Sequence, residues 1–112
     1  MAAKFEIKKS KDGKSFHFSL KSANGQIVLS SETYESKKNA EKGIASIKKN
    51  AANDKRYEQR KGKNDKPYFV LKANNGEVIG RSQMYASDKG VQKGIASVKK
   101  NAPDARVIDL TE

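Results

Sequence analysis

The sequence predicts an α+β fold built from two copies of one unit, each with three short strands followed by a helix. Two observations carry this prediction. The first is an internal repeat: with an offset of 51, 18 of the 37 residues in 15–51 are identical to their counterparts in 66–102. The second is a change within each copy from a hydrophobic period of about 2 to one of about 3.6. We therefore expect one domain, 1–112, made of repeats 4–52 and 53–110.

Alternation of apolar and polar residues predicts the strands. In the first repeat it covers residues 5–7 and 16–20, and a short apolar run follows at 27–29. Asn24-Gly25 predicts a two-residue hairpin turn between the second and third strands, because both residues tolerate positive φ. The second repeat has Asn75-Gly76 at the same place, and the chain ends on a predicted strand at 106–110.

The period of 3.6 predicts a helix after Ser36 and another after Ser87, with each serine as the N-cap. In each helix one apolar stripe is expected to face the sheet. The stripes are Ala40, Ile44, Ile47 and Ala51, and Val91, Ile95, Val98 and Ala102. Asn50 and Asn101 are expected to end the helices in a left-handed conformation, and Pro103 prevents the second helix from continuing.

Gly43 and Gly94 occupy matching positions inside the two helices, where glycine costs roughly 1 kcal/mol relative to alanine. The same cost in both copies predicts close packing of each helix on the sheet. A single unit is thin for independent stability. We therefore expect the two units, related by a pseudo-twofold axis, to share one antiparallel sheet with both helices on one face.

The pattern F-x-F-x-L-K-x-x-N-G, followed by S-x-x-Y-x-S-x-x-x-[AV]-x-x-G-I-A-S-[IV]-K-K-N-A, occurs twice between residues 16 and 102, apart from the leading phenylalanine of the second copy. It closely resembles the duplicated YegP-like family of small bacterial proteins. The resemblance implies paired β3-α-β motifs in a single sheet, with the last strand of each motif exchanged into the other. The segments 56–58 and 106–108 would play that part here. It implies no particular activity or ligand.

The 24 basic and 13 acidic residues give a net charge of +11, which either keeps a small domain soluble or attracts polyanions. There is no cysteine, and no apolar run suits a signal peptide or a membrane span. A cytoplasmic monomer without membrane contact is expected.

Catalytic and metal chemistry find little support in the residues present. His17 is the only histidine, which leaves no base for a nucleophile and no tetrahedral zinc site. No phosphate-binding loop or calcium loop occurs. The sequence therefore predicts no enzyme, no cofactor and no metal.

Binding to a nucleic acid is the hypothesis with the clearest physical basis. If both helices cover one face of the sheet, the opposite face should mix cations with two rings able to stack on bases. Its predicted residues are Lys4, Lys8, His17, Lys21, Arg60, Tyr68 and Lys72. Lysine outnumbers arginine 20 to 4, so such binding should be weak, directed at phosphates and salt-dependent. The alternative is a protein-interaction or assembly module that pairs through its sheet edges.

Overall fold

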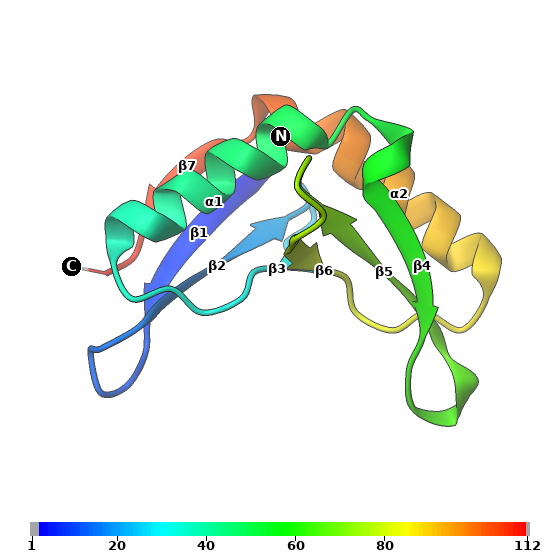
Figure 1. The fold of residues 1–112 in the computed structure, drawn as a ribbon, viewed down its shortest axis with the longest axis horizontal. Coiled ribbons are helices and arrows are strands. Elements are labelled where there is room, and N and C mark those ends of the chain that lie inside the picture. Colours follow the sequence, from blue (N-terminus) through cyan, green and yellow to red (C-terminus); the bar gives the residue numbers. More distant parts are fainter. Residues whose placement is uncertain (1–2, 112) are drawn as a thin grey trace.

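Seven strands form one sheet in the order β4-β5-β6-β3-β2-β1-β7 in the computed structural model, which describes residues 3–111. Figure 1 shows the sheet bent into an arch, with both helices on its outer, convex side. The elements of the first half are β1 (Lys4–Lys9), β2 (Phe16–Lys21), β3 (Ile27–Ser30) and α1 (Lys37–Asn50). Those of the second half are β4 (Tyr57–Lys61), β5 (Pro67–Lys72), β6 (Val78–Arg81), α2 (Asp88–Asn101) and β7 (Arg106–Asp109). Three short 3-10 turns, η1 (Asp54–Arg56), η2 (Lys63–Asp65) and η3 (Ala102–Asp104), complete the elements within residues 3–111.

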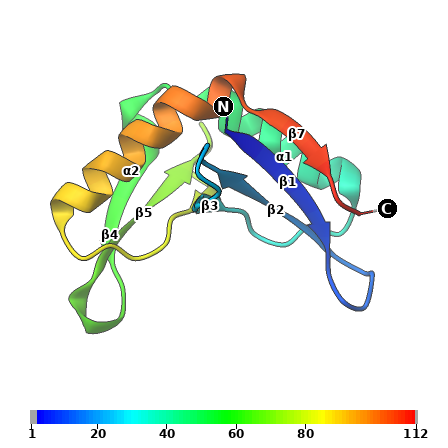
Figure 2. The same ribbon diagram turned by 180° about the vertical axis from the view of Figure 1, so that it is seen from behind.

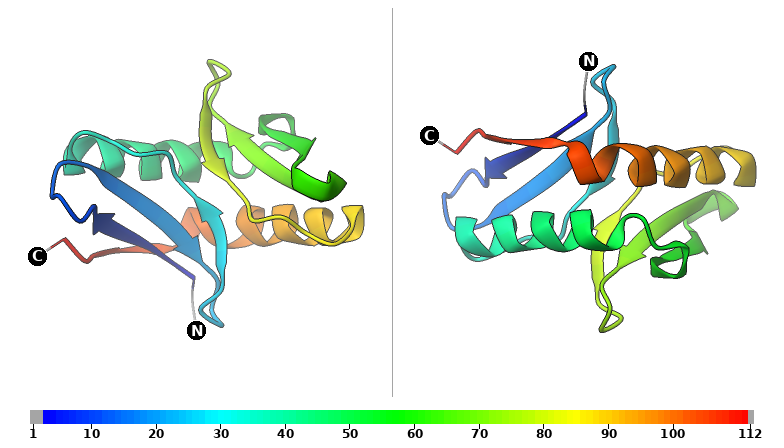
Figure 3. Two further views of the ribbon diagram at one scale, coloured as in Figure 1. Left: turned by 90° about the horizontal axis from the view of Figure 1, so that it is seen from below. Right: turned by 90° about the horizontal axis from the view of Figure 1, so that it is seen from above.

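The two halves meet at the centre of the sheet, where β3 and β6 pair through Ser30 and Arg81. Within each half the strands are antiparallel: β1 pairs with β2 and β2 with β3, and β4 pairs with β5 and β5 with β6. Figure 3 shows α1 over the first half and α2 over the second, with their C-terminal ends meeting above the middle of the sheet.

The last strand departs from the expected antiparallel sheet. β7 runs parallel to β1, with Phe5 opposite Val107, so the sheet is mixed and that part of the prediction is wrong. The antiparallel pairs β6–β3, β3–β2 and β2–β1 make β1 run opposite to β6. After α2 the chain also runs opposite to β6, and it is therefore parallel to β1 where β7 reaches the edge of the first half. Figure 2 shows β7 beside β1 at the edge of the first half. The segment 56–58 contains the start of β4, which pairs with β5 of the same repeat, 53–110, so this segment is not exchanged between the repeats.

The core lies between the helices and the sheet. Phe5, Phe18 and Phe69 are at most 1% exposed and form its largest side chains. The predicted helix stripes are buried against them, with one exception, since Ile95 is only partly buried while its counterpart Ile44 is 3% exposed. The predicted packing periodicity is therefore confirmed at seven of its eight positions.

Both predicted N-caps are present. The Ser36 hydroxyl accepts a hydrogen bond from the backbone N–H of Asn39 over 3.1 Å, and Ser87 accepts one from Gly90 over 3.2 Å. The helices end at Asn50 and Asn101 as expected.

The asparagines at the helix ends do not take the left-handed conformation, so that prediction is wrong. Asn101 has φ −99°, in the right-handed region. Its amide instead donates to the carbonyl oxygen of Ser97 over 2.9 Å, and that of Asn50 donates to Ser46 over 2.8 Å. The side chain therefore satisfies a carbonyl of the last helical turn, and a 3-10 turn at η3 takes the place of a left-handed cap.

The hairpins after β2 and β5 form, but with a longer turn than two residues. The N–H of Ser22 bonds to the carbonyl of Gln26, and Gly25 alone takes a positive φ, at +86°. A third residue in the loop lets a right-handed turn precede the single left-handed glycine. The two-residue turn was therefore wrong, although the place of the hairpin was right.

Gly43 and Gly94 pack against aromatic rings, which confirms the close approach predicted for them. A Cβ atom at Gly94 would lie 2.9 Å from Cε1 of Phe69 and closer still to the hydroxyl of Tyr85. Phe69 and Tyr85 are stacked with their ring centroids 6.3 Å apart. Gly43 meets Phe18 and Tyr34 in the same way.

Candidate nucleic-acid interface

The face of the sheet that the helices leave uncovered, called the helix-free face below, holds the residues predicted to bind a polyanion. Strand alternation and register place all seven there. Lys4 lies opposite Lys21, Lys8 opposite His17, and Arg60 opposite Tyr68. Lys72 follows Tyr68 by four residues on β5 and therefore lies on the same face. Lys8 is exposed and the other six are partly buried. Four belong to the first half of the arch and three to the second.

A carboxylate lies at the centre of this group in the first half. Glu6 is 7% exposed, and its Oε1 lies 2.8 Å from the Nζ of Lys21, while Oε2 lies 3.4 Å from the Nζ of Lys4. The hydrogen bond from Lys21 is the main reason that the pKa of Glu6 lies below its usual value of 4.5. Two of the predicted cations are thus already paired within the protein.

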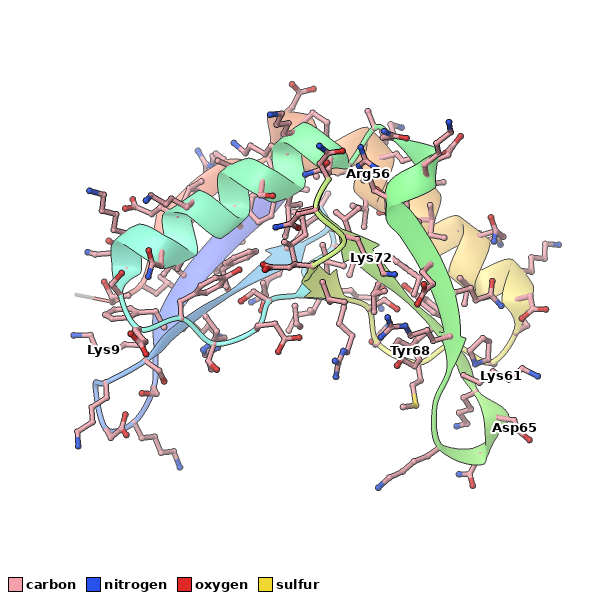
Figure 4. The ribbon with its side chains drawn as sticks, viewed as in Figure 1. Lys9, Arg56, Lys61, Asp65, Tyr68 and Lys72 are labelled. Carbon is pink, nitrogen blue, oxygen red and sulfur yellow. The ribbon has the colours of Figure 1, made fainter. Side chains whose placement is uncertain are left out.

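The second half repeats the arrangement. The Oε1 of Glu58 lies 2.8 Å from the Nζ of Lys72, and its other oxygen accepts a hydrogen bond from Arg60. These two bonds, that from Lys72 first, lower the pKa of Glu58. Figure 4 shows Lys72 and Tyr68 along the inner side of the second half, with Lys61 and Asp65 toward the tip of the β4–β5 hairpin.

Two arginines that were not predicted from the sequence also lie on the helix-free face. Arg81 lies opposite Ser30 on β6, and Arg106 lies opposite Lys4 on β7. The guanidinium of Arg81 is 3.6 Å from the carboxylate of Glu32, and both side chains are more than half exposed. Alternation within the third strand of the second repeat could have identified Arg81. Arg106 can be assigned to this face only from the pairing of β7 with β1, which the local sequence does not reveal.

A hollow of about 340 Å³ lies where the two halves meet. Three pairs of matched repeat positions line it, together with Ile27: Ser30 and Arg81, Ser31 and Ser82, and Glu32 and Gln83. The serines have structural roles, since the hydroxyls of Ser31 and Ser82 accept hydrogen bonds from the N–H groups of Phe18 and Phe69. One arginine and one glutamate leave this hollow without a net charge of either sign.

Within residues 3–111 no cluster of three or more histidine, aspartate or glutamate side chains could hold a metal ion. In the same part of the chain, no helix has the length and apolar character needed to cross a membrane.

The fold and the duplicated face define a class of small α+β proteins made from two copies of one short unit. The model of the domain of unknown function DUF1508 matches the chain twice, at residues 10–58 and 63–109, so the chain belongs to this family. It is 54% identical over 111 residues to the UPF0339 protein ACIAD0721 of Acinetobacter baylyi, covering 99% of both chains. It is 50% identical to the UPF0339 protein YegP of Escherichia coli, over 99% of this chain and all of that one.

Two structures determined by solution NMR have the same fold. The UPF0339 protein SO3888 of Shewanella oneidensis matches with a TM-score of 0.91 at 43% identity, over 99% of this chain and 93% of that one. The protein yegP of E. coli matches with a TM-score of 0.91 at 50% identity, over 99% and 95%. These relatives are described as proteins of unknown function or by family names, and nothing in those names points to catalysis.

Proposed function

We propose that this protein is a non-catalytic binding protein whose helix-free face binds the phosphate backbone of single-stranded nucleic acid. The observation that carries the proposal is the balance of charge on this face. Three acids, Glu6, Glu58 and the Glu32 that pairs with Arg81, accompany seven cations that lie there by strand register: Lys4, Lys8, Lys21, Arg60, Lys72, Arg81 and Arg106. A surplus of this kind attracts polyanions and releases their counterions on binding.

Single strands suit the face better than a duplex. The side chains of His17 and Tyr68 are partly buried among the cations and present rings to the same side. Bases stack on such rings without regard to sequence, at about 1–3 kcal/mol per base. The internal pairs of Glu6 and Glu58 reduce the number of cations available for phosphates, which agrees with weak and strongly salt-dependent binding.

The two repeats, 4–52 and 53–110, supply the face jointly in this proposal. We propose that they are related by a pseudo-twofold axis through the β3–β6 junction, that the strand after α2 joins the first repeat, and that the protein acts as a cytoplasmic monomer. The matched pairs around the central hollow and the pairing of β7 with β1 support this arrangement.

Fluorescence anisotropy with labelled single-stranded DNA, single-stranded RNA and duplex DNA of equal length tests the proposal at low and at physiological salt. We expect the single strands to bind more tightly than the duplex, and affinity to fall steeply with salt. Non-specific binders reach dissociation constants of about 10⁻⁴ to 10⁻⁶ M near physiological salt. No binding tighter than about 100 μM under that condition would remove the support for a nucleic-acid function.

A further inference from the structure

The two outer edges of the sheet are not equivalent. In the first half, β7 continues the sheet beyond β1 as a parallel strand. In the second half, β4 is the last strand of the order, and within residues 3–111 no strand lies beyond it. The position that β7 occupies beside β1 is therefore vacant beside β4, although β1 and β4 are the corresponding first strands of the two repeats.

The occupied edge shows how a strand is held in this position. With β7 in place, Phe5 and Ile7 of β1 are both 0% exposed. The N–H of Leu110 donates to the carbonyl oxygen of Ile7 over 2.9 Å. At the far end of β7, the carboxylate of Asp109 lies 2.8 Å from the Nζ of Lys37, the first residue of α1. Backbone bonds and one charge pair to the helix start thus fix the strand.

The vacant edge has the same components with a hollow in place of the strand. The first turn of repeat one is one residue longer, so the offset between the first strands is 52, and Tyr57 and Gln59 correspond to Phe5 and Ile7. Ile95 corresponds to Ile44, and each of the three residues at the vacant edge is more exposed than its counterpart. Together with Asp54, Gln92 and Lys99 they line a hollow of about 450 Å³ between β4 and α2.

The charge at the helix start is reversed at this edge. Asp88 begins α2 where Lys37 begins α1, and its carboxylate accepts a hydrogen bond from the amide of Gln59 over 2.8 Å. A strand could be held beside β4 in the way that β7 is held beside β1. Such a strand would need a basic residue at the position of Asp109 in order to pair with Asp88. The β7 strand of a second copy would bring Asp109 toward Asp88, and like charges in such a place repel.

We infer that the edge of β4 is a docking site for an extended peptide segment of a partner protein, which adds to the sheet parallel to β4. The segment carries an apolar residue beside Tyr57 and, two positions later, a lysine or arginine beside Gln59 that pairs with Asp88. Backbone hydrogen bonds to β4 supply affinity, and the contact with Asp88 selects the sequence. This site lies at the end of the sheet and is separate from the cations of the helix-free face.

Two synthetic peptides derived from β7 test the inference. The first has the sequence of residues 104–111 with Asp109→Lys, and the second keeps the natural aspartate as its matched control. Each is titrated into the isotope-labelled full-length protein and followed by NMR. We expect the lysine peptide to shift the amide signals of residues 57–61 and 92–99, with an affinity about fivefold higher than that of the aspartate peptide. Shifts confined to residues 4–9, which would mean displacement of β7, or no shifts at all, would overturn the inference.

Charge exchange at the helix start provides the second arm. Asp88→Lys introduces at the start of α2 the residue type that begins α1, so the fold should accommodate the substitution. We expect this variant to bind the aspartate peptide more tightly than the lysine peptide. Glu77→Lys changes the net charge equally at an exposed position in the β5–β6 turn, and should leave the preference unchanged. An unchanged preference in Asp88→Lys would refute the role of Asp88. Self-association of the natural protein that the lysine peptide cannot compete with would show that a second copy is the occupant.

Discussion

The carboxylate of Glu6 lies 2.8 Å from the ammonium group of Lys21, on a face of the sheet where it is only 7% exposed. Glu58 and Lys72 form the same pair at the same distance in the second repeat. The duplication has therefore preserved an ion pair on the surface as well as the residues of the core. It places an acid at the centre of each group of cations.

The Glu6 pair should make stability depend on acidity. Because hydrogen bonding to Lys21 lowers the pKa of Glu6 in the folded state, the folded protein binds this proton less readily than the unfolded chain. The stabilisation is thus complete above the usual pKa of 4.5 and is lost as the pH falls through the lowered value. We expect Glu6→Gln to reduce the loss of stability measured by urea unfolding between about pH 6 and about pH 3. An identical pH profile for both proteins would contradict this.

The close packing of Gly94 predicts a substitution effect opposite to helix propensity. Valine forms helices better than glycine, so propensity alone predicts that Gly94→Val stabilises α2. Because a Cβ there already meets Phe69 and Tyr85, we expect a loss of about 1–3 kcal/mol in the free energy of unfolding. Adding Tyr85→Phe, which removes the nearest atom, should recover part of the loss. Chemical denaturation of the three proteins decides the sign, and an unchanged or higher stability of Gly94→Val would show that the rings move aside freely.

The hydroxyl of Tyr57 donates to the carbonyl oxygen of Ala51 over 2.6 Å. Tyr57→Phe should cost about 1 kcal/mol, the contribution of one hydrogen bond, without disturbing the fold, because repeat one has Phe5 at this position. Burial raises the pKa of Tyr57 above its usual value of 10, so its contribution is present below that pH and lost as the pH rises further. Denaturation at neutral pH and above about pH 10 should show the two proteins converging at high pH. A constant difference would refute the role of the hydroxyl.

Salt dependence can locate the phosphate contacts. Each phosphate contact to a single strand contributes about 0.7 to the slope of log K against log salt. We expect Lys8→Gln, on the helix-free face, to reduce the slope by about that amount. Lys38→Gln, which removes an exposed charge from α1, serves as the matched control and should leave the slope as it is. Equal effects of the two substitutions would show that net charge alone governs binding, with no preferred face.

Local patterns in the sequence predict most of the fold. Ser36 and Ser87 begin the helices because a hydroxyl before an apolar period satisfies the first free N–H groups. The apolar stripes and the alternating strands also follow from period alone. The conformation at the helix ends was harder to predict. Asn50 and Asn101 can either adopt a left-handed backbone conformation or donate a hydrogen bond from the side-chain amide to a carbonyl of the last helical turn. Only the packed structure decides between these conformations.

The candidate site was predicted less completely. Strand alternation correctly placed the side chains of Lys4 and Lys21 on one face, and it placed Glu6 on the same face. It could not show that Glu6 pairs with Lys21, because this ion pair depends on the distance between neighbouring strands. Arg106 could not be assigned to this face from local sequence, because its strand pairs with residues about a hundred positions earlier. Such a long-range contact leaves no periodic signal near either partner.

The pairing of β7 with β1 also constrains how the protein is made. Strand β1 is the first to leave the ribosome and β7 is the last, so during synthesis the first half of the sheet stays incomplete while the rest of the chain is translated. Contacts this distant in sequence slow the final folding step, because the intervening chain must be ordered before they form. A nascent chain halted before residue 106 exposes two open sheet edges, at β1 and β4, and the addition of β7 leaves one.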